Sequence, residues 1–380
     1  MQNNQKIPEG WSVKKISDLG NVVSGGTPDT NNSEYWDGDI LWVTPSEVSS
    51  LSNRFISNTE RKITEKGLKE SSAKLLPINS LIICTRATIG DCCINNVPMC
   101  TNQGFKNVIV KNNNVDFLYY LITKNKNELI RKACGSTFLE ISKKDIDNLK
   151  FAIPPLLEQE KIAGILGTWD EAIEKLSSLI EQKKLLKKGL MQRLIYNRND
   201  IKLYRVADLF ELGRGRVISK EEIEKNRGEY PVYSSQTSNN GVLGCINTYD
   251  FQGEYITWTT DGANAGEVFY RNGKFNCTNV CGTAKLKKDS KVNLYYAMSF
   301  LNHVSKKYVS YVGNPKLMNG VFATIPLELP TLEIQNKIAN ILSTADEEID
   351  LLNKKLEALK EQKKGLMQQL LTGQTRVKVN

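Results

Sequence analysis

Residues 153–194 read IPPLLEQEKIAGILGTWDEAIEKLSSLIEQKKLLKKGLMQRL, and residues 329–370 read LPTLEIQNKIANILSTADEEIDLLNKKLEALKEQKKGLMQQL. The two segments are identical at 22 of 42 positions without a gap, at a constant shift of 176 residues (329 − 153). Unrelated segments would agree at only a few positions, so these two are copies of one ancestral unit. The copies divide the chain into a first region, a copy, a second region and a copy.

Each copy predicts a long helix, because its apolar residues recur at steps of three and four. The second copy carries this seam at Ile338, Ile341, Ala345, Ile349, Leu352, Leu356, Leu359, Leu366 and Leu370, and skips one position at Lys363. The first copy carries it at Ile162, Ile165, Trp169, Ile173, Leu176, Ile180, Leu190 and Leu194, with interruptions at Lys183 and Lys187. Thr168 and Thr344 each begin a capping-box pattern, which predicts a break inside each helix.

The narrow seam favours pairing of the two helices with one another, and packing of each helix on its own domain is the alternative. About 130 residues separate the copies. A domain of that size has its entry and exit close together, so the helices should run antiparallel. We predict an α+β fold in which two mixed α/β domains are separated by two long antiparallel coiled-coil helices with pseudo-two-fold symmetry. The predicted boundaries are 1–152 and 199–328 for the domains, and 153–198 and 329–380 for the helices.

The two regions outside the copies share weaker likenesses. Short β-rich runs stand at residues 40–44, 81–85 and 106–110, and again at 255–259, 267–270 and 283–286. One helix is predicted in each region, near residues 115–132 and 293–307. Cys100-Thr101-Asn102 matches Cys277-Thr278-Asn279, and Leu118-Tyr119-Tyr120 matches Leu294-Tyr295-Tyr296. These matches predict equivalent positions in two divergent copies of one domain.

The composition is that of a folded protein without a membrane span. The 380 residues are 40% hydrophobic and 24% charged, and no apolar run approaches the ~18 residues that a bilayer-spanning helix needs. Residues 1–5 lack the apolar stretch of a signal peptide, so we expect a cytoplasmic protein. The net charge of +9 permits an anionic partner. The eight cysteines include no Cys-x-x-Cys pair, and we expect buried apolar side chains rather than metal ligands.

The sequence lacks the motifs of enzymes that act on nucleic acids. It contains no Asp/Asn-Pro-Pro-aromatic segment of an adenine methyltransferase and no Gly-x-x-x-x-Gly-Lys-Ser/Thr phosphate loop. His303, the only histidine, falls in a predicted helix. Pro28-Asp29 followed by Glu60-Arg61-Lys62 fits a loose pattern for metal-dependent nucleases. The residues around Asp29 are typical of a turn, however, and we favour that interpretation.

Several strings resemble a known family. They are IPEGW at 7–11, GGTP at 25–28, YW at 35–36, GDI at 38–40, WVTP at 42–45, IPPLxEQxxI at 153–162, LPTLxxQxxI at 329–338, GLMQ at 189–192 and 365–368, and LTG at 371–373. With two unlike domains alternating with two copies of a helix, the chain resembles the specificity (S) subunit of type I restriction–modification enzymes over nearly its whole length. The second copy departs from the pattern because it lacks the second proline and the glutamate before Gln335.

The resemblance implies two target-recognition domains, each reading one half of a split, asymmetric sequence in double-stranded DNA. The helices would act as a spacer and would dock two modification (methyltransferase) subunits, which bind S-adenosylmethionine and methylate adenine. Two restriction (motor–nuclease) subunits, which use ATP and Mg²⁺, would join for cleavage. This chain itself would have no cofactor, no metal and no catalytic residue. The alternatives are a single-chain metal-dependent DNA nuclease and a coiled-coil adaptor without DNA readout.

Base-reading residues should be polar side chains on loops, because arginine reads guanine and asparagine or glutamine reads adenine in the major groove. In the first domain the candidates are Thr44, Ser46, Arg86, Thr88, Gln103, Ser136, Thr137 and Lys143. In the second domain they are Ser234, Gln236, Thr259, Asp261, Asn264, Asn279, Asn314 and Lys316. For each of these residues an ordinary turn or capping role is the alternative.

Overall fold

The computed structural model describes residues 7–134, 139–196, 201–236 and 238–378. The chain divides into two compact units. Unit 1 comprises Met1–Leu179 and Asn353–Asn380, and unit 2 comprises Ile180–Leu352. Each unit therefore holds one mixed α/β domain together with part of each long helix. Over the described residues, no helix has the length and apolar character needed to cross a lipid bilayer.

The two copies of the repeat form the two long helices that the sequence predicts. Helix α7 spans Leu156–Tyr196 and helix α12 spans Leu332–Leu370. Both helices are continuous, so the predicted breaks at Thr168 and Thr344 are wrong. The Thr168 hydroxyl donates to the carbonyl of Gly164 one turn earlier, at 3.0 Å. A threonine in a helix can satisfy its hydroxyl in this way without ending the helix.

The domain of unit 1 is built on two small sheets. The five-stranded sheet has the order β2 (Gly20–Ser24), β9 (Phe105–Val110), β6 (Ser80–Cys84), β7 (Cys92–Asn95) and β4 (Phe55–Ile56). The three-stranded sheet has the order β5 (Arg61–Ile63), β3 (Trp36–Val43) and β8 (Cys100–Thr101). Strand β1 (Ser12–Lys15) pairs antiparallel with β10 (Lys150–Ile153), which leads into α7. The helices are α1 (Ile16–Leu19), α2 (Pro45–Ser50), α3 (Glu65–Lys69), α4 (Val115–Lys124), α5 (Lys126–Lys132) and α6 (Lys143–Asp147).

The domain of unit 2 repeats this plan. One sheet has the order β12 (Phe210–Arg214), β19 (Cys281–Leu286), β16 (Tyr255–Thr259) and β17 (Val268–Arg271). The other has the order β14 (Val242–Ile246), β13 (Arg227–Tyr233), β18 (Lys274–Cys277) and β15 (Phe251–Gln252). Strand β11 (Lys202–Arg205) pairs antiparallel with β20 (Pro326–Leu329), as β1 does with β10. The helices are α8 (Val206–Leu209), α9 (Lys220–Lys225), α10 (Leu294–Val304) and α11 (Asn319–Thr324).

The secondary structure predicted for the domains is largely confirmed. Each of the six predicted β-rich runs contains a strand, and each predicted helical region contains a helix. The region 115–132 is two helices rather than one, because Asn125 ends α4 and precedes α5. The Asn125 side chain donates to the carbonyl of Leu121 at 2.7 Å, which terminates the first helix locally.

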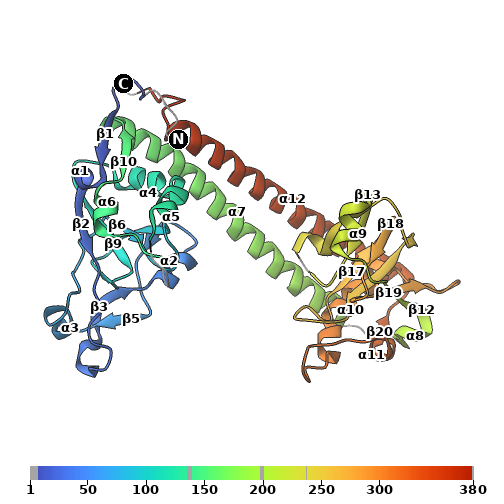
Figure 1. Ribbon diagram of the computed structural model, residues 1–380. Coiled ribbons are helices and arrows are strands. Elements are labelled where there is room, and N and C mark those ends of the chain that lie inside the picture. Colours follow the sequence, from blue (N-terminus) through green and yellow to red (C-terminus); the bar gives the residue numbers. More distant parts are fainter. Residues whose placement is uncertain (1–6, 135–138, 197–200, 237, 379–380) are drawn as a thin grey trace. The chain divides into compact units, whose positions relative to one another are not determined.

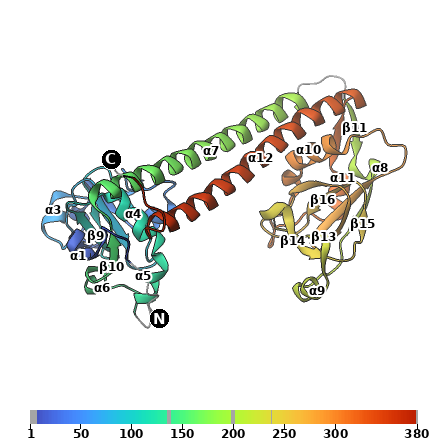
Figure 2. The ribbon, with the colours of Figure 1, turned by 90° about the horizontal axis from the view of Figure 1, so that it is seen from above.

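The long helices both pair with one another and pack on the domains. In unit 1, Ile162 and Leu166 near the start of α7 share a core with Leu370 at the end of α12 (Figure 1). In unit 2, the start of α12 shares a core with the end of α7, because Leu342 lies in the cluster against which Leu194 packs (Figure 2). The antiparallel arrangement is therefore confirmed. Ile341, which we placed on the seam, is exposed, and its neighbour Leu342 is buried instead.

The backbone defines which positions of the two domains are equivalent. In unit 1, Gly26 N donates to the carbonyl of Thr101 at 2.9 Å, and in unit 2, Arg216 N donates to that of Cys277 at 3.1 Å. Thr101 therefore corresponds to Cys277 at a shift of 176 (277 − 101). The predicted match of Cys100-Thr101-Asn102 with Cys277-Thr278-Asn279, at a shift of 177, is wrong by one residue.

The tyrosine match is wrong by three residues. Asn114 caps α4, because its side chain accepts from Phe117 N, and Asn293 caps α10 by accepting from Tyr296 N. The caps are equivalent at a shift of 179 (293 − 114). The shift is larger than 176 because the connection from β19 to α10 is three residues longer than the connection from β9 to α4. Tyr120 therefore corresponds to Ser299, and Leu118-Tyr119-Tyr120 and Leu294-Tyr295-Tyr296 occupy different helical positions.

Candidate nucleic-acid interface and helix anchors

A repeated glutamine attaches each domain to the start of its long helix. The Gln159 side chain accepts from Asn114 N at 2.9 Å and donates to the carbonyl of Pro154 at 2.9 Å. In unit 2 the Gln335 side chain accepts from Asn293 N and donates to the carbonyl of Pro330, both at 2.9 Å. Both glutamines are buried. The repeat thus retains Gln159 and Gln335 because a buried amide satisfies two backbone groups at one junction.

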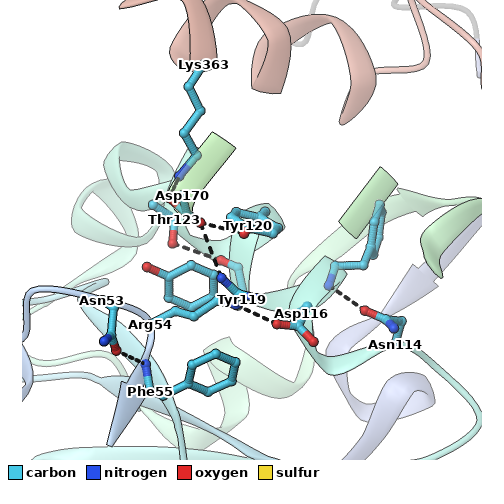
Figure 3. Close-up of polar contacts among 11 residues, drawn as sticks. Asn53, Arg54, Phe55, Asn114, Asp116, Tyr119, Tyr120, Thr123, Asp170 and Lys363 are labelled. Carbon is cyan, nitrogen blue, oxygen red and sulfur yellow. Dashed lines mark hydrogen bonds and ion pairs between the residues drawn. The ribbon is translucent and has the colours of Figure 1, made fainter. Parts of the chain in front are cut away.

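A cluster of charged residues centred on Asp170 connects α7, α12 and the domain of unit 1 (Figure 3). The Asp170 carboxylate accepts a hydrogen bond from the Tyr120 hydroxyl at 2.5 Å and pairs with Lys363 of α12. Arg54 lies 3.5 Å from the same carboxylate and 2.6 Å from Asp116. Burial raises the pKa of Tyr120, and its hydrogen bond to Asp170 raises it further. Tyr120 therefore stays protonated and acts as a donor.

The same aspartate–lysine pair recurs in unit 2. Lys187 of α7 lies 2.6 Å from Asp346 of α12, and the Tyr295 hydroxyl also donates to Asp346. Asp346 and Lys363 are the repeat partners of Asp170 and Lys187 at a shift of 176. The lysines that interrupt the predicted seam are therefore the partners of these aspartates. We name the two clusters anchor 1 (Tyr120, Asp170, Lys363, Arg54, Asp116) and anchor 2 (Tyr295, Asp346, Lys187).

The tyrosines of the two anchors occupy different positions in their helices. Tyr120 is the sixth residue after the cap of α4, whereas Tyr295 is the second residue after the cap of α10. The residue that corresponds to Tyr295 in unit 1 is Asp116, which binds Arg54 instead. The chemistry at the helices is thus retained although the residues that supply it from the domains differ.

Unit 1 has a further contact that explains why the second copy departs from the family pattern. Glu158 is only 1% exposed. Its carboxylate binds Arg376 of the C-terminal segment at 2.8 and 2.9 Å and accepts from the Trp11 indole at 3.1 Å. In unit 2 the corresponding residue is Ile334, which packs against the apolar core. A buried carboxylate needs a cation as partner. Arg376 is that partner for Glu158 in unit 1, whereas the apolar Ile334 needs none in unit 2.

Four predicted base readers of unit 1 lie on segments that follow strands and meet at one edge of the domain. Arg86 follows β6 and Gln103 follows β8, whereas Thr44 follows β3 and caps α2. Ser46 lies within the first turn of α2, so the expected loop position is wrong for this residue. A side chain built at Gly104, beside Gln103, would lie 3.5 Å from Pro45 Cγ and 3.7 Å from Arg86 Cβ, so the two loops and the start of α2 are adjacent. We call this set of segments edge 1.

The remaining candidates of unit 1 have other surroundings or lie outside the described residues. Lys143 pairs with Asp147 one turn later on α6, at 2.8 Å. Thr88 is only partly exposed, and its hydroxyl is buried. Ser136 and Thr137 lie outside the described residues.

Unit 2 brings a corresponding set of loops together, which we call edge 2. Lys316 lies 3.9 Å from Asp261, and the Arg214 guanidinium lies 3.4 Å from the same carboxylate. Arg214 also donates to the carbonyl of Asn279 at 2.5 Å. Ser234 joins the edge because its hydroxyl accepts from Thr278, next to Asn279, at 3.3 Å.

The four remaining candidates of unit 2 have different surroundings. Two of them hold loops in place, one is exposed on a loop, and one is buried. The Asn264 amide donates to the carbonyl of Ser235 at 3.2 Å, and the Gln236 amide donates to that of Val242. Asn314 is exposed in the loop between Ser310 and Lys316. Thr259 is the last residue of β16 and is buried, so it offers no surface to a base and we do not retain it as a reader.

Sequence reasoning missed two charged residues at these edges. Glu140 binds Arg86 at 2.5 Å and lies 3.5 Å from Lys106 in edge 1. Burial raises the pKa of Glu140, but the hydrogen bonds and charges of Arg86 and Lys106 together outweigh it, so the pKa is lowered overall. In edge 2 the missed residue is Arg214, which lies 3.4 Å from Asp261. Sequence pattern carries no signal for either residue, because each pairs with a residue more than 40 positions away.

The nuclease-like pattern does not form a metal site in the part of the chain described. The Asp29 carboxylate accepts from the backbone of Asn31 at 3.0 Å, which closes a local turn. Among the described residues, no group of three or more potential metal ligands comes together. The turn interpretation of this segment is therefore favoured.

Comparison with known proteins gives the family. The model of the type I restriction modification DNA specificity domain matches residues 8–182 and 198–361. A chain of Mycoplasma pneumoniae, S.MpnORF289P N-terminus, bears the name of a type I specificity subunit and is 52% identical over 145 residues, or 38% of this chain and 77% of that one. The MjaIX specificity subunit of Methanocaldococcus jannaschii is 34% identical over 271 residues, which are 66% of this chain and 62% of that protein.

Solved structures share the fold. The S subunit of a type I restriction–modification system from M. genitalium superposes with a TM-score of 0.63 at 16% identity, over 100% of this chain and 99% of that one. A chain solved in work on complex assembly of the type I R-M system gives a TM-score of 0.58 at 15% identity, over 97% and 100% of the two chains. The likeness at this identity concerns the fold, whereas the family follows from the sequence matches. By these matches, the chain belongs to the family of type I restriction–modification DNA specificity subunits.

Proposed function

We propose that this chain selects the DNA sequence on which a type I restriction–modification complex acts. Edge 1 and edge 2 each read one half of a bipartite, asymmetric site in double-stranded DNA. The paired helices α7 and α12 fix the number of base pairs between the half-sites and dock two modification subunits. Methyl transfer from S-adenosylmethionine takes place on those subunits, and two ATP- and Mg²⁺-dependent restriction subunits join for cleavage.

The observation that supports this proposal is the combination of a repeated scaffold with unlike edges. Gln159 and Gln335, and the two Asp–Lys pairs of the anchors, recur at equivalent positions. The loops at the two edges carry different polar residues on that common frame. A scaffold that keeps its helix contacts and varies its loops suits two readers of different sequences, because loops carry recognition while rigid elements position them.

Mapping of methylated adenines tests the proposal. The chain is expressed with its modification subunit in cells whose DNA carries no adenine methylation, and cells without this gene serve as the control. We expect methylation at one bipartite sequence only when the chain is present. Methylation that does not depend on the chain would contradict the proposal. DNA cleavage by the purified chain with Mg²⁺ would favour the nuclease alternative, and complexes that assemble without sequence preference would favour the adaptor.

The isolated chain is expected to transfer no methyl groups and to cut no DNA. The reason is that the sequence holds neither a methyltransferase segment nor a phosphate loop, and that Asp29 is engaged in a turn. Incorporation of label from S-adenosylmethionine into DNA, and nicking of plasmid with Mg²⁺, measure the two activities. Activity that persists after the chain has been separated from its partners would overturn this expectation.

Replacing Arg86 with alanine is expected to weaken recognition of the first half-site and to spare the second. A lost base contact costs about 1–3 kcal/mol, or roughly 5- to 150-fold in affinity for the correct half-site. Binding of duplexes altered in one half-site at a time measures this loss. Lys66→Ala removes an equally exposed cation elsewhere in the same domain and should leave recognition intact. Equal weakening on every DNA sequence would instead mark Arg86 as a phosphate contact.

A further inference from the structure

The two edges carry one ion pair at the same structural position, with the charges exchanged. In edge 1 the pair is Arg86 with Glu140, whose nitrogen and oxygen lie 2.5 Å apart. In edge 2 it is Asp261 with Lys316, at 3.9 Å. The cation stands on the loop after β6 in unit 1, whereas the loop after the matching strand, β16, carries the carboxylate in unit 2.

Backbone contacts establish that these positions correspond. Arg86 follows Thr85, whose carbonyl accepts from Ile141 N at 3.1 Å, and Glu140 precedes Ile141. In unit 2, Asp261 follows Thr260, whose carbonyl accepts from Leu317 N at 2.9 Å, and Lys316 precedes Leu317. Glu140 and Lys316 also form matching antiparallel bridges, Glu140 with Cys134 and Lys316 with Ser310. The two pairs therefore occupy equivalent positions in the two domains.

In both edges the cation is the outer member of the pair. The side chains of Arg86 and Lys316 are 45% and 53% exposed, whereas those of Glu140 and Asp261 are 29% and 22% exposed. A second cation also contacts each carboxylate: Lys106, which is 9% exposed, lies 3.5 Å from Glu140, and Arg214, which is 39% exposed, lies 3.4 Å from Asp261. Each carboxylate thus pairs with two cations, and the side chains of Arg86 and Lys316 remain partly exposed to solvent.

A carboxylate at a surface that meets DNA is unfavourable unless it makes a specific contact, because phosphates repel it. In a G·C pair, guanine offers the acceptors O6 and N7 in the major groove, and cytosine offers the N4 amino donor. O6 and N4 are neighbours, because they bond to one another within the base pair. A cation next to a carboxylate therefore matches the two edges of one G·C pair, with the cation on guanine and the carboxylate on cytosine.

We propose that this ion pair is a specificity determinant in each domain and reads one G·C pair, in opposite strand orientation in the two domains. Arg86 contacts guanine and Glu140 contacts cytosine in the first half-site. In the second half-site Lys316 contacts guanine and Asp261 contacts cytosine, so that the base pair is reversed relative to the domain frame. The inference rests on the proposed function and adds to it the base pair that one position reads.

Exchanging the charges in edge 2 tests the inference. The variant D261R/K316E reproduces the order of charges found in edge 1 and keeps the net charge of the pair. Arg214, the neighbour of residue 261, is exposed enough to remain solvated beside the new arginine. We expect one G·C pair of the second half-site to be replaced by C·G in the methylation map of the variant complex, with a change in preference of about tenfold or more. The first half-site should be unchanged.

Two further variants make the result specific. K316R keeps the order of charges and should keep the base preference. E267K/K306E exchanges an ion pair of similar exposure, 26% and 56%, elsewhere in the same domain and should change no base. Thermal unfolding at the wild-type temperature shows that the exchanged variant is folded. An unchanged second half-site, or weakening at every sequence alike, would refute the inference. A wild-type complex without bipartite methylation would instead refute the proposed function itself.

Discussion

Asp170→Ala is expected to destabilise unit 1 by about 3 kcal/mol, because removing one partner of a largely buried charge network leaves the others uncompensated. Asp170 is 20% exposed, and it contacts Lys363, Arg54 and Tyr120. Asp346→Ala should destabilise unit 2 less, by about 1 kcal/mol, because Asp346 is 33% exposed and its cation, Lys187, is the only one in anchor 2. The two substitutions remove equivalent residues of the repeat, so the difference measures the combined effect of Arg54 and of the deeper burial of Asp170.

Chemical unfolding followed by tryptophan fluorescence measures both effects. Glu171→Ala removes the carboxylate next to Asp170 on the same helix, where it faces solvent 3.7 Å from Lys175, and should change the free energy of unfolding by less than about 0.5 kcal/mol. Asp170→Asn keeps the shape of the side chain and separates charge from packing. Equal losses for Asp170→Ala and Asp346→Ala would show that neither Arg54 nor the deeper burial of Asp170 makes anchor 1 more stabilising than anchor 2.

The sequence predicts the long helices well, because their signal is periodic and occurs twice. A repeat that is identical at 22 of 42 positions identifies the unit, and apolar steps of three and four identify the helix. The lysines at 183, 187 and 363 interrupt the predicted seam, because a search for apolar periodicity gives no role to charged residues. In three dimensions each of these lysines pairs across the helices: Lys187 with Asp346, Lys363 with Asp170, and Lys183 with Glu348 at 2.7 Å.

The edges could be predicted only in part. The expectation of polar side chains on loops led to Arg86, Asp261 and Lys316, because loops carry recognition residues. Their partners Glu140 and Arg214 come from distant parts of the chain, and only the sheet topology brings them close. Short string matches also misled the alignment of the domains, since the connection before α10 is longer than that before α4. Hydrogen bonds of the backbone, rather than residue identity, established the correspondence of Arg86 with Asp261.

The length of the helices between the anchors is expected to set the spacing of the half-sites. Asp170 and Lys187 are 17 residues apart on α7 (187 − 170), and Asp346 and Lys363 are 17 residues apart on α12 (363 − 346). Each anchor joins the early part of one helix to the late part of the other. Inserting four residues after Leu176 and four after Leu352 therefore keeps both anchors intact while lengthening both helices between them.

The paired insertion adds ~6 Å and slightly more than one turn to each helix, which nearly preserves the seam. B-DNA rises ~3.4 Å per base pair, so the spacer of the methylated site should lengthen by one or two base pairs. The half-site sequences should stay the same, because neither edge is altered.

An insertion after Leu176 alone is the matched control. It leaves 21 residues on α7 against 17 on α12 between the anchors (17 + 4), so one anchor must break or the extra turn must bulge. We expect this single insertion to lose methylation rather than to lengthen the spacer. An unchanged spacer with full activity in the paired variant would show that something other than these helices fixes the distance. Changed bases within a half-site would show that the readers are not the two divergent domains, since only the helices differ between the variant and the natural chain.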